Sequence, residues 1–134
     1  AFGRTPLAIS ARCYHARVHG HSKDSCQFVC DRDADGMTVE TLDHEPFLAV
    51  NGVQTLSYAF CNLLKEANDL VDTGVSSLRL SPHTCDMVAV AQLFRAVLDG
   101  RRDADEAFAL SHDACPSATF ANGFVHGAAG ALYV

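Results

Sequence analysis

Three cysteines in one polar stretch near the start of the chain constrain its structure and function most. Cys13, Cys26 and Cys30 follow a C-x12-C-x3-C spacing. The basic residues of the same stretch are Arg12, Arg17 and Lys23. Thiolates are preferred ligands of iron–sulfur clusters and of zinc, and neighbouring cations help a thiol to deprotonate. The pattern therefore predicts a metal-binding loop that supplies three cysteine ligands, one fewer than a closed set.

The composition predicts one soluble globular domain. The chain has 134 residues, of which 49% are hydrophobic and 19% charged, which is enough for a single core. Its net charge of −6 argues against a general nucleic-acid binder, because phosphate recognition needs a clustered basic face. No apolar run approaches the length of a membrane span. Six cysteines could form a disulfide scaffold, but the long aliphatic stretches favour reduced thiols and a cytoplasmic location.

Strand and helix patterns alternate along the chain and predict an α/β fold. Short strands are expected at residues 6–10, 37–42 and 47–50, the last two as a hairpin, and another at 75–80. Apolar spacing at three and four residues predicts helices over 54–72 and 82–100, with a shorter helix over 103–110. This rhythm favours parallel strands covered by helices, with too few units to close a barrel.

Several motifs occur in an order that resembles one known family. They are 10–14 (SARCY), 23–26 (KDSC), Cys30, 46–48 with 51–55 (PFL, NGVQT), 79–82 (RLSP) and 122–127 (NGFVHG). On these residues the chain resembles the U32 peptidase-like family over nearly its whole length, and it is most similar to the branch that serves ubiquinone biosynthesis. The resemblance implies a partial TIM-barrel-like fold, in which residues 1–134 are the carboxy-terminal half of a U32-type barrel. Residues 10–36 would be the cluster-binding loop and 37–134 the α/β part.

The resemblance also implies a cofactor, a partner and an activity. The cofactor is a [4Fe–4S] cluster whose ligands here would be Cys13, Cys26 and Cys30, with the fourth ligand upstream of this chain. The partner is a UbiU-like subunit in a heterodimer, and the process is oxygen-independent ring hydroxylation of a ubiquinone precursor in anaerobic ubiquinone biosynthesis. The sequence itself indicates no catalytic residues.

Two other functions stay open. From spacing alone zinc is as good a prediction as iron–sulfur, because His15, His19 or His21 could complete a Cys3His set in a zinc-stabilised binding module. A collagenase-type U32 peptidase is the third hypothesis, although no activated nucleophile is evident in the sequence.

The remaining candidate residues have simpler interpretations beside the functional ones. Cys61 is expected on the apolar side of the helix at 54–72 as a core residue. Cys85 follows Pro82 in the first turn of a helix, where the dipole favours a thiolate, while Cys115 has no assigned role.

His126 lies in a glycine-rich segment that could border a ligand site at the end of a strand. Arg79 and His83 flank a strand-to-helix junction of the kind where α/β proteins bind ligands.

Overall fold

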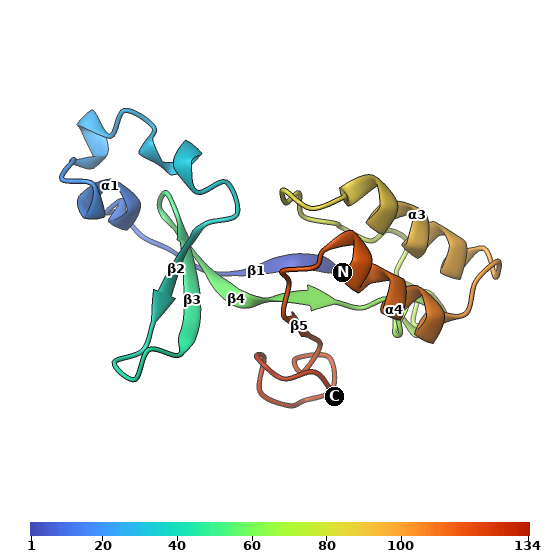
Figure 1. Cartoon of the computed structure of the whole chain (residues 1–134). Helices are drawn as coiled ribbons and strands as arrows, with labels where there is room; N and C mark the ends of the chain where they lie inside the picture. The colour runs from blue at the N-terminus through green and yellow to red at the C-terminus, as the bar shows by residue number, and fades with distance from the viewer. The chain divides into compact units, whose positions relative to one another are not determined.

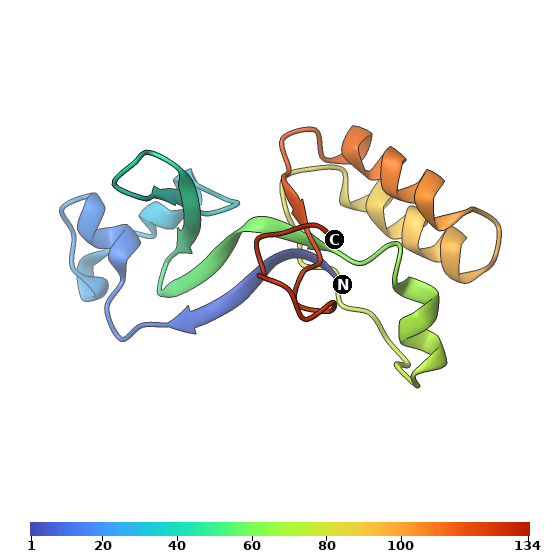
Figure 2. The same cartoon turned by 90° about the horizontal axis from the view of Figure 1, so that it is seen from below.

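The computed structural model describes all residues 1–134 and has a mixed α/β fold (Figures 1 and 2). The chain divides into two compact units, which are described separately. The loop unit comprises residues 4–59, and the helical unit comprises residues 1–3 and 60–134. No helix is both long enough and apolar enough to cross a membrane.

The loop unit is built on antiparallel strands. Its elements are most of β1 (Phe2–Ile9), α1 (Tyr14–Val18), the short 3-10 helices η1 (Lys23–Ser25) and η2 (Val29–Arg32), β2 (Met37–Glu40), β3 (Pro46–Asn51) and the first part of β4 (Gln54–Asn62). The first residues of β1 and the last of β4 belong to the helical unit. The strand order is β1-β4-β3-β2, with Thr38 opposite Ala49 and Ala49 opposite Leu56. A tight turn at Gly52, whose φ is 61°, joins β3 to β4. The expected hairpin of 37–42 with 47–50 is confirmed.

The helical unit contains the main hydrophobic core. Its helices are α2 (Ala67–Asp72), α3 (Met87–Leu98) and α4 (Ala104–Ala114). The side chains of Asp86 and Asp103 cap α3 and α4 by accepting backbone N–H bonds. Figure 1 shows α3 and α4 side by side, and both contribute to the core. The fully buried core residues of these helices include Val90, Val97 and Ala107.

A short parallel ladder positions one edge of the helical unit. Strand β5 (Phe120–Ala121) pairs in parallel with the end of β4, with Phe60 opposite Phe120. Phe2 packs edge-to-face against both of these rings, at centroid distances of 6.2 and 5.9 Å. Because the two strands are parallel, the residues that follow them emerge at the same edge.

Two sequence predictions about secondary structure are wrong. Residues 54–72 do not form one helix, because 54–62 belong to β4 and only Ala67–Asp72 is helical. The turn at Gly52 and the strand-forming residues Thr55, Tyr58 and Phe60 decide this segment for a strand. The expected strand at 75–80 is reduced to an isolated parallel bridge between Leu80 and Phe2.

The barrel prediction is correct only at the level of fold class. The structure is α/β, but its sheet is open rather than a closed barrel, and the pairings of β2, β3 and β4 are antiparallel. The predicted helix at 82–100 begins later, at Met87, since Asp86 supplies its cap. The helix expected at 103–110 is confirmed and extends to Ala114.

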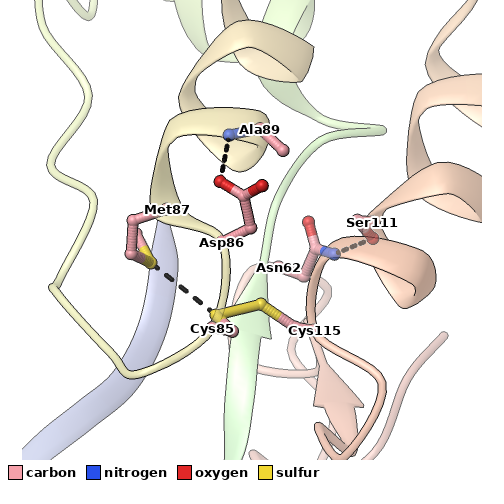
Figure 3. Close-up of a disulfide and its surroundings, with 7 residues drawn as sticks. All are labelled: Asn62, Cys85, Asp86, Met87, Ala89, Ser111 and Cys115. Carbon is pink, nitrogen blue, oxygen red and sulfur yellow. Dashed lines mark hydrogen bonds between the residues drawn. A yellow bond between two sulfur atoms is a disulfide. The ribbon is translucent and has the colours of Figure 1, made fainter.

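A disulfide joins the start of α3 to the end of α4, contrary to the expectation of reduced thiols. Cys85 and Cys115 are bonded across a sequence separation of 30 residues (Figure 3). Cys85 therefore precedes the helix and is not a thiolate in its first turn. Beside the disulfide, Asn62 donates to the Ser111 hydroxyl at 2.9 Å, and both side chains are fully buried.

Reduction of this disulfide should destabilise the helical unit by about 3 kcal/mol, because the bond closes a loop of 30 residues. Urea unfolding of the chain with and without reductant, followed by circular dichroism, measures the difference. The double variant C85S/C115S is the control and should respond equally in both buffers. An unmodified chain that is equally indifferent to reductant would contradict the prediction.

Candidate metal centre

The three predicted cysteine ligands are free thiols held by short helical turns of the loop unit. Cys13 is the N-cap of α1, where its Sγ accepts a hydrogen bond from the Ala16 amide at 3.4 Å. Cys26 follows η1 directly as its C-cap, and Cys30 lies within η2. Short helical turns, of which α1 has a side-chain cap, therefore position these side chains.

Two of the thiols share one small apolar cluster. Cys13, Ala16 and Val29 are its buried members, and Cys26 packs against them. Cys30 is the neighbour of Val29 but is not a member of the cluster, and it is partly exposed. The structure thus brings Cys13 and Cys26 to one apolar cluster and leaves Cys30 outside it, and the three thiols are not among the donor atoms that converge within 4.8 Å of one another.

The backbone between Cys26 and Cys30 turns through an unusual conformation. Gln27 and Phe28 both have positive φ, at 51° and 54°, although neither is glycine. Such residues cost of order 1 kcal/mol or more each and persist where the surrounding structure holds them. The pair reverses the chain so that η2 follows η1 closely.

A hollow beside Cys13 carries an excess of positive charge. It has a volume of about 630 Å³ and is bordered by the basic residues Arg12, Arg17 and Lys23, together with one carboxylate, Asp24. His21 also lines it. An anionic group bound at Cys13 would be stabilised by this surplus of cations.

A second group of metal-ligand side chains lies next to Cys13 on the inner side of α1. The donor atoms of His15, His19 and Asp33 all lie within 4.8 Å of one another. His15 is fully buried, and its Nε2 is 2.9 Å from Asp33 Oδ2. In the sequence Asp33 belongs to an acidic turn at 31–36 (DRDADG) that resembles only the opening of a calcium loop, so its grouping with the two histidines emerges only from the fold.

The helical unit contains a separate polar cluster at the edge where β4 and β5 end. Glu66 is 7% exposed, and its Oε1 accepts from Asn122 Nδ2 at 2.8 Å and lies 2.9 Å from His126 Nε2. If Nε2 carries the proton, the carboxylate orients the ring and leaves Nδ1 as a base. The prediction of His126 near a strand end agrees with this placement, whereas Glu66 was missed because it lay inside a mispredicted helix.

Asn122 also fixes the end of the chain. Its Oδ1 accepts from the Val134 amide at 2.7 Å, and its Nδ2 donates to the Val134 carbonyl at 3.1 Å. The amides of Asn122 and Gly123 both donate to the Leu132 carbonyl. One side chain therefore joins Glu66 to the closing segment.

The other candidate residues, Cys61, His83 and Arg79, take part in packing and backbone contacts. Burial raises the pKa of the Cys61 thiol, and the nearby Glu66 carboxylate raises it further against the opposing effect of the amino terminus. Cys61 thus stays protonated and unreactive, on β4 rather than on a helix. His83 lies against the Phe60 ring at 4.2 Å, and the Arg79 carbonyl accepts from the amino-terminal residues.

The family of the chain is shown by its match to a family model. Residues 1–133 match the model described as peptidase family U32. The chain therefore belongs to the U32 family, an α/β protein whose cysteine loop and Glu66–His126 edge lie within the matched region. No solved structure matches the chain.

Replacing Asn122 by alanine should lower the free energy of unfolding by about 2 to 3 kcal/mol, because the change removes hydrogen bonds and leaves the buried Glu66 carboxylate with one donor fewer. Asn68→Ala is the matched control, since Asn68 is exposed and should change stability by less than about 0.5 kcal/mol. Urea titration measures both variants. Equal stabilities would show that Asn122 does not hold this edge.

Proposed function

We propose that this chain is part of an iron–sulfur protein of the UbiV type, which supports oxygen-independent hydroxylation in anaerobic ubiquinone biosynthesis. The observation that carries the proposal is the set of three free thiols with C-x12-C-x3-C spacing in a loop of short helical turns. Membership of the U32 family is compatible with it. The cofactor is a [4Fe–4S] cluster ligated by Cys13, Cys26 and Cys30.

The surroundings of these cysteines fit an anionic cluster. A cluster with four thiolates carries net negative charge, and the hollow at Cys13 has three basic side chains against one carboxylate. Cys13 caps α1, and the left-handed residues Gln27 and Phe28 lie in the turn between the other two ligands. When bound, a cluster supplies a one-electron route for a hydroxylation that uses no dioxygen.

Three further statements belong to the same proposal. The chain is the carboxy-terminal part of a longer U32-type domain, with residues 10–36 as the cluster loop and the fourth ligand upstream. It acts in a heterodimer with a UbiU-like subunit on a ubiquinone precursor. A cytoplasmic location belongs to the same proposal: the four free thiols favour it, whereas the Cys85–Cys115 disulfide is of a kind that is rare in that compartment.

A peptidase is the second candidate, and the Glu66–His126 pair favours it. A histidine that a buried carboxylate orients can take a proton from an attacking water or nucleophile. Cleavage of collagen-derived peptides that is lost in the His126→Ala variant would support this function over the first. A zinc-stabilised binding module is the remaining alternative and predicts a colourless protein with stoichiometric zinc.

The cluster hypothesis predicts a brown protein after anaerobic purification, with absorbance at about 400 nm and matching iron and sulfide contents. The longer polypeptide that supplies the fourth ligand is the proper sample. Cys26→Ser should lose most of the iron, because a hydroxyl does not replace a thiolate on this soft metal centre.

Cys61→Ser is the matched control, since Cys61 lies on β4 in the helical unit and is expected to leave the iron content unchanged. A Cys26→Ser protein with full iron content would remove Cys26 from the ligand set. Stoichiometric zinc without colour in the unmodified protein would exclude the cluster.

A further inference from the structure

We propose that His15, His19 and Asp33 form a binding site for one divalent transition-metal ion of the zinc class, separate from the thiolates of the cysteine loop. The three donor atoms lie within 4.8 Å of one another, as the ligands of a single ion must. The proposal is independent of the function proposed above, because it uses none of the three cysteines.

The two histidines reach the site from one face of α1. They are four residues apart, at the start of the helix and at its C-cap, so their side chains lie one above the other. Their rings stack with centroids 5.5 Å apart and an interplanar angle of 23°. Asp33 approaches from the C-cap of η2, and its Oδ2 is 2.9 Å from His15 Nε2. Two ligands of one ion with metal bonds of about 2.1 Å lie about 3 Å apart.

The contacts of His15 fit those of a metal-ligating histidine. Its Nδ1 lies 3.3 Å from the Val50 carbonyl oxygen, which can only accept, so Nδ1 is the donor of this pair. Its Nε2 lies 2.9 Å from Asp33 Oδ2 without the alignment of a hydrogen bond, and a metal ion could take both atoms as ligands. A bond from the second ring nitrogen to a backbone carbonyl is also the usual support of a metal-ligating histidine.

The unpaired ring nitrogen of His19 also points to a bound ion. Its Nε2 is buried and has no hydrogen-bond partner. A buried polar nitrogen without a partner is unfavourable unless something absent from the polypeptide satisfies it. A metal ion on His15 and Asp33 would satisfy His19 at the same time.

The donor set indicates which ions fit. Two imidazoles and one carboxylate suit Zn²⁺, Co²⁺ or Fe²⁺, whereas Ca²⁺ and Mg²⁺ prefer sets of oxygen ligands only. His15 is fully buried, but the Asp33 side chain is 37% exposed, so an ion can enter from the Asp33 side and keep a water ligand there.

Cobalt titration of the full chain tests the site. In the thiol-free background C13S/C26S/C30S, we expect one Co²⁺ per chain with visible ligand-field bands, no sulfur-to-cobalt charge transfer, and displacement by Zn²⁺. His19→Ala or Asp33→Asn in this background should weaken binding at least about tenfold. His44→Ala is the matched control that should leave the affinity unchanged, because His44 is exposed and does not belong to the group.

Two results would overturn the proposal: no uptake of Co²⁺ by the folded chain, or uptake that His19→Ala and Asp33→Asn leave unchanged. If the thiol-free background does not fold, the thermal stability of the unmodified chain with and without Zn²⁺ replaces the titration. The Zn²⁺-dependent rise in melting temperature should then be lost in Asp33→Asn, which removes no candidate ligand of a Cys3His site, and kept in His44→Ala. Loss of the iron–sulfur cluster in Cys26→Ser leaves these readouts untouched, so the two proposals fail separately.

Discussion

One fully buried imidazole holds the cysteine loop to the sheet of the loop unit. His15 meets the Val50 carbonyl on β3 with one ring nitrogen and approaches Asp33 after η2 with the other. Through these contacts a five-residue helix, too short to be stable alone, acquires a fixed place. Cys13 caps that helix, so the position of the first thiol depends on a residue that is not itself a cysteine.

The helical unit concentrates polar chemistry where its short parallel ladder ends. The β4–β5 pairing comprises only Phe60 with Phe120 and Cys61 with Ala121, yet it delivers Glu66 and the Asn122–His126 segment to the same place. The buried carboxylate accepts from two partners at one oxygen, while Oε2 has none. That oxygen is free to accept from a water or a ligand group, and this is why the Glu66–His126 pair supports the second candidate function.

The sequence was informative where local rules decide structure, and misleading where the partner strand decides it. The hairpin at 37–50 and the helices after Asp86 and Asp103 follow from turn and capping residues close in the chain. Residues 54–62 have apolar spacing that fits a helix as well as a strand, and the strand is selected by the Gly52 turn together with the pairing of 54–57 with β3 and of 60–61 with β5. Asp33 and Glu66 could not be predicted as site residues for the same reason, since their partners His15 and His126 are 18 and 60 positions away.

The two donor sets of the loop unit are chemically different, and this difference allows both to act in one short stretch. Thiolates prefer iron–sulfur clusters, while imidazole with carboxylate prefers harder divalent ions such as zinc. Cys13 and His15 are only two residues apart, but Cys13 points its Sγ toward the amide of Ala16 and lines the basic hollow, whereas His15 is directed to Val50 and Asp33. An ion on the histidines would tie α1 to the segment after η2. It would thereby hold Cys13 and the chain that carries Cys30 in register before any cluster is assembled.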